Sequence, residues 1–106
     1  MMAMMMVTWA LAPDVSAVPV TATPTTIGAR LYASCAGCHG TAGAGTGQAV
    51  PLLAGQPQQA LVASMRAFKD GTRAATIMQQ IVKGYTDQEL ELIAAYLAAQ
   101  KPKGQP

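Results

Sequence analysis

The feature that most constrains this chain is the pentapeptide Cys35-Ala-Gly-Cys38-His39, which contains both cysteines and the only histidine of its 106 residues. Two thiols three positions apart can each add to one vinyl group of a haem, and the following residue then brings its imidazole beneath the ring to bind iron. The C-x-x-C-H spacing therefore predicts one covalently attached haem c, with thioethers at Cys35 and Cys38 and an axial iron ligand at His39.

Three other chemistries use cysteines at this spacing, and each fits the chain less well. A thioredoxin-like dithiol needs a βαβ setting, whereas this chain has helical patterns and no strand signal. A structural zinc ion needs four ligands, and the chain offers only these three cysteine and histidine side chains. A disulfide between Cys35 and Cys38 is chemically possible, but it leaves the adjacent His39 unexplained.

Hydrophobic periodicity predicts an all-α domain of three to five short helices. We expect helical segments over residues 27–35, 58–70, 76–83 and from a capping box at 86–89 onward. Thr25 or Thr26 is the expected cap of the first helix, and Gly71 is the expected stop of the second. The intervening stretch over 40–57 contains five glycines, which predicts a loop that is neither helix nor regular strand.

Helices of this size leave few large side chains for a core. The chain has one Phe, three Tyr and one Trp, and Trp9 lies in the apolar N-terminal run. A core this thin needs a disulfide, a metal or a large prosthetic group to complete it. A covalent haem around which the helices wrap supplies that apolar volume, so the fold and cofactor predictions support one another.

The first residues resemble the apolar centre of a secretory signal. Residues 1–13 carry no charge but are too few for a bilayer span of about 20 residues, and small side chains follow. A segment lying on the membrane or a frayed end is the alternative. We expect four regions: a signal peptide over 1–17, an extended leader over 18–25, a domain over 26–101 and a tail over 102–106. Because c-type haem is attached outside the bacterial cytoplasm, we expect a periplasmic protein without a stable membrane span.

The charge balance bears on partners. The formal net charge is +2, only 11% of residues are charged, and no basic run occurs. This pattern argues against nucleic-acid binding.

A second axial ligand is expected to be a methionine, because soft thioether sulfur suits low-spin iron and raises its reduction potential. Only Met65 and Met78 lie beyond the first six residues. Met65 falls on the apolar stripe of the segment over 58–70, which favours packing. Met78 lies 39 residues after His39, far enough to reach the opposite face of the haem, although packing beside Ile81 is the alternative.

Four landmarks give the chain a resemblance to the class I c-type cytochromes. They are Ile27–Tyr32, Cys35–Gly40, Val50–Gln56 and Ile93–Leu97, and with the segments between them they span most of the chain. This resemblance implies a small class I cytochrome c fold in which the first and last helices cross closely. Gly28 would allow the approach, with Tyr32 and Tyr96 packed beside it.

The same resemblance assigns further site residues. It implies that the Pro51 carbonyl accepts a hydrogen bond from the His39 imidazole and that Met78 is the distal iron ligand. A haem with both axial positions filled has no place for substrate, so the chain alone is expected to transfer electrons without catalysis. The glycine-rich residues 40–47 are the expected rim of the haem edge, and Arg73 is a candidate contact of a haem propionate.

A more local similarity concerns the partner. Phe68–Gly71, Thr76–Met78 and Ile81–Tyr85 are similar to the haem subunit of flavocytochrome c sulfide dehydrogenase. This similarity implies an FAD-containing, sulfide-oxidising partner subunit and a downstream electron acceptor. The c4- and c5-type cytochromes share many landmarks, so a free carrier that serves a terminal oxidase is the alternative. A haem enzyme or gas sensor with an open distal site is the third class, and it predicts high-spin iron.

Overall fold

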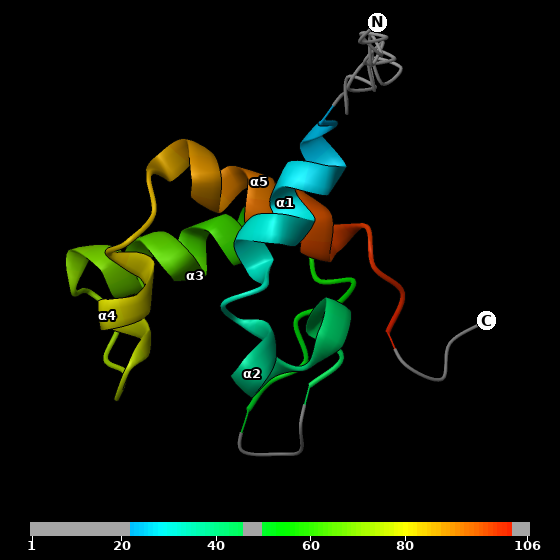
Figure 1. The fold of residues 1–106 in the computed structure, drawn as a ribbon. Coiled ribbons are helices and arrows are strands. Elements are labelled where there is room, and N and C mark those ends of the chain that lie inside the picture. The colour runs from blue at the N-terminus through cyan, green and yellow to red at the C-terminus, as the bar shows by residue number, and fades with distance from the viewer. Residues whose placement is uncertain (1–21, 46–49, 103–106) are drawn as a thin grey trace, which may run out of the picture.

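In the computed structural model the described residues, 22–45 and 50–102, fold into an all-helical domain (Figure 1), which confirms the predicted class. The helices are α1 (Pro24–Tyr32), α2 (Ala36–His39), the 3-10 turn η1 (Thr41–Gly43), α3 (Gln58–Asp70), α4 (Met78–Val82) and α5 (Asp87–Ala98). Within this part of the chain, no helix has the length and apolar character needed to cross a bilayer. The predicted signal peptide, residues 18–21 of the predicted leader and residues 103–106 of the predicted tail lie outside the described residues.

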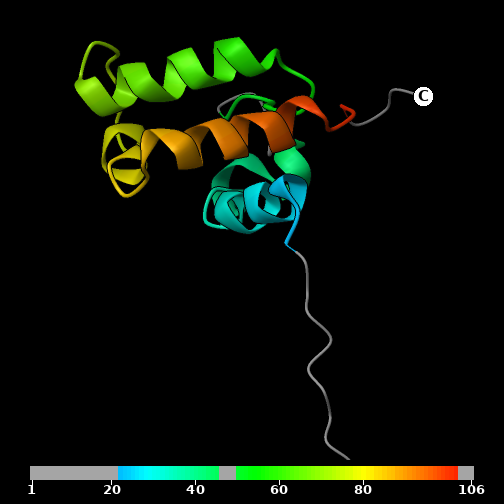
Figure 2. The same ribbon diagram turned by 90° about the horizontal axis from the view of Figure 1, so that it is seen from above.

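Helix α5 is the centre of the packing. It lies between α1 and α3 and contacts both, as Figure 2 shows, while α4 packs on α3. Three buried residues of α5, Ile93, Ala94 and Leu97, recur at helical spacing and so share one face. The core cluster joins these to residues of α1 and α3 and consists of Tyr32, Leu61, Val62, Ile93, Ala94 and Leu97.

The crossing of α1 and α5 depends on Gly28. A Cβ atom at this position would lie 2.9 Å from the Cβ of Tyr96 and would also clash with the carbonyl oxygen of Leu92. The rings of Tyr32 and Tyr96 pack beside the crossing with their centroids 5.7 Å apart. The close crossing implied by the class I resemblance is therefore present.

The first helix begins and ends three residues earlier than predicted. Thr23, and not Thr25 or Thr26, is its cap, since the Thr23 hydroxyl accepts a hydrogen bond from the Thr26 backbone N–H at 3.2 Å. Pro24 then occupies the first turn, where a missing N–H costs nothing. The predicted extended leader over 18–25 was therefore wrong in its last two residues, which are helical.

Two short elements near the cysteine motif also differ from the predictions. Cys35 is the N-cap of the separate helix α2 and does not end the first helix. The predicted loop over 40–57 begins with η1, where Gly40 adopts a φ of +84° and its carbonyl accepts from the Gly43 N–H at 3.2 Å. Turns this short are held by local backbone hydrogen bonds and leave no apolar period in the sequence.

The longer helices agree with their predicted bounds. Helix α3 covers the expected residues and ends at Gly71, whose φ of +84° is left-handed. Helix α5 begins at the predicted capping box: the Glu89 N–H donates to the Thr86 hydroxyl at 3.1 Å, and the Thr86 N–H donates to the Glu89 carboxylate at 2.9 Å. Helix α4 is shorter than the predicted segment over 76–83, because it begins only at Met78.

Candidate functional site

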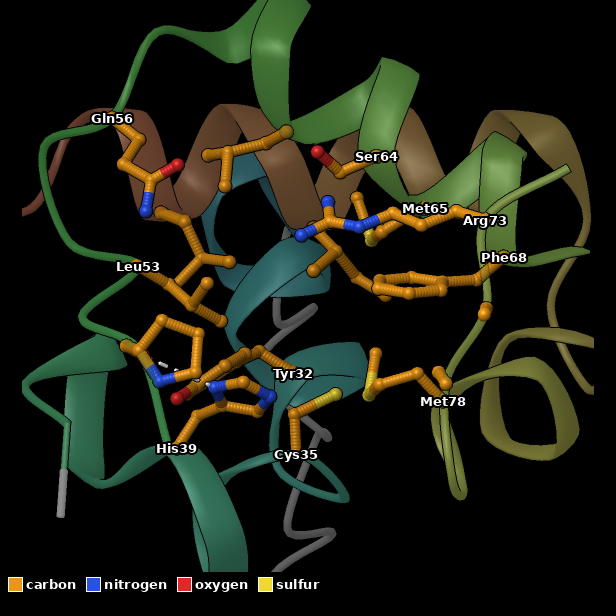
Figure 3. A pocket seen from close by; sticks show the side chains of 16 residues that line it. Tyr32, Cys35, His39, Leu53, Gln56, Ser64, Met65, Phe68, Arg73 and Met78 are labelled. Atoms are coloured by element: carbon orange, nitrogen blue, oxygen red, sulfur yellow. Dashed lines mark hydrogen bonds between the residues drawn. The ribbon is translucent and has the colours of Figure 1, made fainter. Parts of the chain in front are cut away.

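A cavity of about 320 Å³ lies where α2, α3, α5 and the loop after Val50 come together (Figure 3). Cys35, His39 and Met78 all line it, although they belong to segments far apart in the sequence. Many of the other lining side chains are apolar, among them Leu53, Leu61, Met65, Phe68, Ile93 and Leu97. The predicted thiol, imidazole and thioether donors therefore meet in one largely apolar cavity, the setting that a haem requires.

The imidazole and the thioether enter the cavity from different elements. His39 is buried and is the last residue of α2, whereas Met78 is the first residue of α4. In Figure 3 these two side chains lie on either side of Cys35. These two side chains would hold the iron of a haem in this cavity, and that ligand set stays a prediction.

The loop that follows the glycine-rich stretch orients the His39 ring. His39 Nδ1 lies 3.3 Å from the carbonyl oxygen of Pro51, which is the contact that the class I resemblance implies. The backbone N–H groups of Leu53 and Ala54 both donate to the carbonyl of Gly43 at 3.0 Å and so hold this loop against η1. A hydrogen bond from Nδ1–H to a carbonyl leaves Nε2 as the ring nitrogen that can bind a metal.

The far end of the cysteine motif is tied to α1. The Tyr32 hydroxyl donates to the carbonyl of Gly40 at 2.5 Å, and the Gly45 N–H donates to the carbonyl of His39 at 2.6 Å. Burial raises the pKa of the Tyr32 phenol, so the hydroxyl remains a donor at neutral pH. The predicted rim over 40–47 is described only as far as Gly45.

The two cysteines have different surroundings. Cys35 is half-buried against the core cluster and lines the cavity, whereas Cys38 is exposed. Burial raises the pKa of the Cys35 thiol, and the hydrogen bond with the Ser34 hydroxyl opposes this shift. One thiol thus forms part of the cavity wall, and the other is open to solvent.

Three polar side chains, Gln56, Ser64 and Arg73, also line the cavity. The Arg73 guanidinium carbon lies 4.7 Å from the centroid of the Phe68 ring, a cation–π contact that fixes the charge beside the cavity. The contact between Arg73 and a haem propionate stays a prediction. Gln56 and Ser64 were not predicted as cavity residues, since a single glutamine or serine carries no spacing signal.

Comparison with known proteins gives relatives of one kind. The chain is 41% identical over 69 residues to the cytochrome subunit of sulfide dehydrogenase from Chlorobaculum tepidum, which covers 65% of this chain and 62% of that protein. It is 36% identical over 108 aligned positions to the thiosulfate dehydrogenase electron acceptor of Stutzerimonas stutzeri, covering 89% of this chain and 50% of that protein. The chain is 39% identical over 74 residues to cytochrome c4 of Pseudomonas aeruginosa, and the aligned region covers 70% of this chain and 37% of that protein. The chain therefore matches between roughly a third and two thirds of the length of each of these relatives.

The cofactor follows from the same comparison and from the cavity. A model of the cytochrome c family matches residues 25–101, which includes every residue of the C-x-x-C-H motif. Covalently bound haem c is the cofactor of this family, and the donors and apolar lining of the cavity suit it. Its iron accepts and returns single electrons. The chain thus belongs to the cytochrome c family of electron-transfer haem proteins.

Proposed function

We propose that this cytochrome accepts electrons from a sulfide-oxidising, FAD-containing partner subunit and passes them to a downstream acceptor. The observation that carries the proposal is the 41% identity to the cytochrome subunit of sulfide dehydrogenase. The match covers only 62% of that protein, so membership of the cytochrome c family does not by itself assign its partner to this chain. The flavoprotein partner is therefore part of the proposal.

Within this proposal, each site residue has one role. Cys35 and Cys38 bind the haem through thioethers, His39 is the proximal iron ligand, and Met78 is the distal ligand. When bound, the haem supplies reversible one-electron chemistry at its iron. Pro51 fixes the His39 ring through the 3.3 Å contact to Nδ1, which raises the basicity of the liganding nitrogen.

The cavity lining supports electron acceptance over catalysis. Two filled axial positions leave no coordination site for a substrate. The apolar side chains around them exclude water and disfavour the extra positive charge of the oxidised state, which raises the reduction potential together with the thioether ligand. A cytochrome with these properties accepts electrons readily from a flavin and retains its geometry in both oxidation states.

The proposal is tested by mixing the holoprotein with the flavin-containing subunit of a sulfide dehydrogenase and adding sulfide without oxygen. We expect rapid haem reduction that requires both the flavoprotein and sulfide, and we expect the two chains to co-purify. Holoprotein with sulfide alone is the control for direct chemical reduction. Absence of flavoprotein-dependent reduction together with absence of co-purification would overturn the proposal.

A second candidate is a free electron carrier, which is the alternative that the resemblance to c4- and c5-type cytochromes implies. Two observations favour it: the match to a thiosulfate dehydrogenase electron acceptor covers 89% of this chain, and the match to cytochrome c4 covers 70%. A free carrier predicts fast electron exchange with a terminal oxidase and no stable complex with the flavoprotein. The same mixing experiment, with a terminal oxidase in place of sulfide and flavoprotein, separates the two candidates.

We also propose a periplasmic location that follows export. Covalent attachment of c-type haem outside the bacterial cytoplasm supports it, as does the signal-like composition of residues 1–17. N-terminal sequencing of the mature holoprotein tests the proposal, with Val18 as the expected first residue. An intact N-terminus on haem-loaded protein would contradict cleavage.

A further inference from the structure

We propose that Tyr85 is a positioning residue that holds the segment bearing Met78 against the cysteine motif and so keeps the distal ligand in place. The inference rests on the proposed role of Met78 as the iron ligand. It starts from a contact between two parts of the chain that are 51 residues apart.

The side chain of Tyr85 reaches the start of the cysteine motif. Its hydroxyl donates to the carbonyl of Leu31 in the last turn of α1 at 3.2 Å. The Tyr85 hydroxyl also forms a hydrogen bond with the hydroxyl of Ser34, which itself lies 3.4 Å from the same Leu31 carbonyl oxygen. Ser34 directly precedes Cys35, so the phenol is fixed beside the first thioether position.

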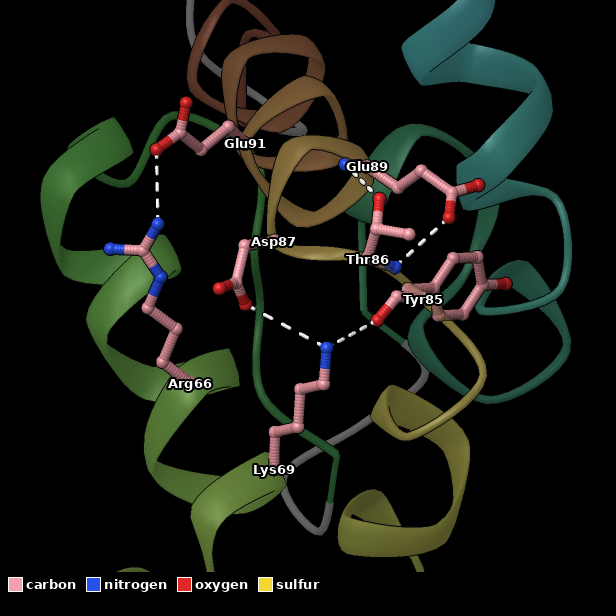
Figure 4. Close-up of polar contacts among 7 residues, drawn as sticks. All are labelled: Arg66, Lys69, Tyr85, Thr86, Asp87, Glu89 and Glu91. Carbon is pink, nitrogen blue, oxygen red and sulfur yellow. Dashed lines mark hydrogen bonds and ion pairs between the residues drawn. The ribbon is translucent and has the colours of Figure 1, made fainter.

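The main chain of Tyr85 is held from the opposite side, by α3. Lys69 Nζ donates to the Tyr85 carbonyl oxygen at 2.6 Å and also lies 3.7 Å from a carboxylate oxygen of Asp87 (Figure 4). The Tyr85 N–H donates to the carbonyl of Val82 at 3.2 Å, which closes the turn after α4. One residue therefore fixes the C-terminal end of α4 to both α3 and α1.

The segment before α4 is tied to α3, because the Arg73 N–H donates to the carbonyl of Ala67 at 3.1 Å. Residues 71–74 are exposed, and Ile77, directly before Met78, is 57% exposed. The helix itself is only five residues long, so Met78 lies close to the turn that Tyr85 holds at the C-terminal end. The Tyr85 contacts thus join the segment that bears Met78 to the cysteine motif.

Displacement of Met78 by an added ligand measures this restraint. Imidazole binds the iron only when Met78 has left it. Its apparent affinity therefore rises with the fraction of molecules in which Met78 is off the iron, which we call the open state. Loss of the Tyr85 hydroxyl removes the contacts to Leu31 and Ser34, which favour the closed state, in which Met78 is bound to the iron. A typical hydrogen bond contributes enough to change that population roughly threefold to tenfold.

The test is an imidazole titration of the ferric holoprotein, followed by the long-wavelength absorption band of sulfur-ligated haem. We expect Tyr85→Phe to bind imidazole roughly threefold to tenfold more tightly than the wild type. Tyr96→Phe is the matched control, because it removes the same hydroxyl from a ring that packs at the α1–α5 crossing, and we expect its titration to match the wild type.

A second variant keeps the test independent of any folding defect in the first. Ser34→Ala removes the partner hydroxyl and is expected to tighten imidazole binding in the same direction, and the double variant is expected to be less than additive because the two side chains share one contact. A denaturant titration of each variant separates a local opening at Met78 from a loss of global stability.

The outcomes distinguish this inference from the proposed function. Unchanged imidazole affinity in both Tyr85→Phe and Ser34→Ala, with the sulfur band present, overturns the role of Tyr85 and leaves Met78 ligation standing. A wild-type protein without the sulfur band overturns Met78 ligation and this inference together. Failure of sulfide-driven reduction affects the proposed partner alone.

Discussion

At the scale of single residues, the two methionines of the described chain line one cavity, so substitution can separate their roles. We expect Met78→Ala to lose the sulfur absorption band and to bind carbon monoxide when reduced, because the iron then has an open position. Loss of the thioether should also lower the reduction potential by on the order of 100 mV. Visible spectroscopy and a redox titration measure both effects.

Met65→Leu is the matched control for this substitution. Met65 lines the same cavity from α3 and packs against the core cluster, and leucine preserves most of its volume. We expect the sulfur band and the reduction potential to remain close to those of the wild type. Loss of the sulfur band in Met65→Leu, together with its retention in Met78→Ala, would reverse the assignment of the distal ligand.

Arg73 gives a second prediction at this scale. A positive charge beside the cavity disfavours the ferric state, so we expect Arg73→Gln to lower the reduction potential by on the order of 20–50 mV at low ionic strength. The shift should shrink with added salt, since Arg73 is exposed. Lys83→Gln, an exposed change at the end of α4, is the charge-matched control. Equal shifts in both variants would contradict a specific role for Arg73.

The residues of the site differ in how far the sequence could predict them. Cys35, Cys38 and His39 are adjacent and of rare types, so their spacing carries the chemistry. Pro51 came only from the family resemblance, because it contributes a backbone carbonyl that every residue has. Tyr85 was not predicted to act at the site, since its contact to Ser34 depends on the packing of distant segments.

At the scale of elements, the crossing of α1 and α5 gives the third prediction. We expect Gly28→Ala to destabilise the holoprotein by about 1–3 kcal/mol, because the new methyl group meets Tyr96 and the Leu92 carbonyl. Gly37→Ala is the control: a Cβ at this position of α2 has no neighbour within 4 Å, and alanine is the better helix former. Denaturant unfolding of the two variants should therefore differ, and equal midpoints would contradict the close crossing.

Helix length decided how well the elements could be predicted. Helices α3 and α5 are long enough to show a repeating apolar face, and each has a clear end signal in Gly71 or in the Thr86 capping box. In α1 the cap was misplaced because several threonines are adjacent, and only the structure selects Thr23. The 3-10 turn at η1 depends on the φ angle of Gly40, which the sequence permits but does not specify.

At the scale of the whole molecule, the haem cavity completes a small core. Among the described residues the largest fully buried side chains are Leu90, Ile93, Leu97 and Val82, and two of these, Ile93 and Leu97, also line the cavity. Protein interiors pack densely, so a cavity of about 320 Å³ beside so few core residues is costly without a cofactor. The composition predicts a core with few large side chains, and the structure has a cavity beside that core. A haem that fills the cavity completes the core and is therefore part of the fold.

The central claim is that Cys35 and Cys38 together bind one haem. The reduced pyridine haemochrome spectrum of the purified holoprotein tests it most directly, because the position of its main band depends on how many vinyl groups have been converted to thioethers. We expect the band of a haem with both vinyl groups converted, at one haem per chain, and no haem released into acidified acetone. A band characteristic of one or two unreacted vinyl groups, or extractable haem, would contradict the claim.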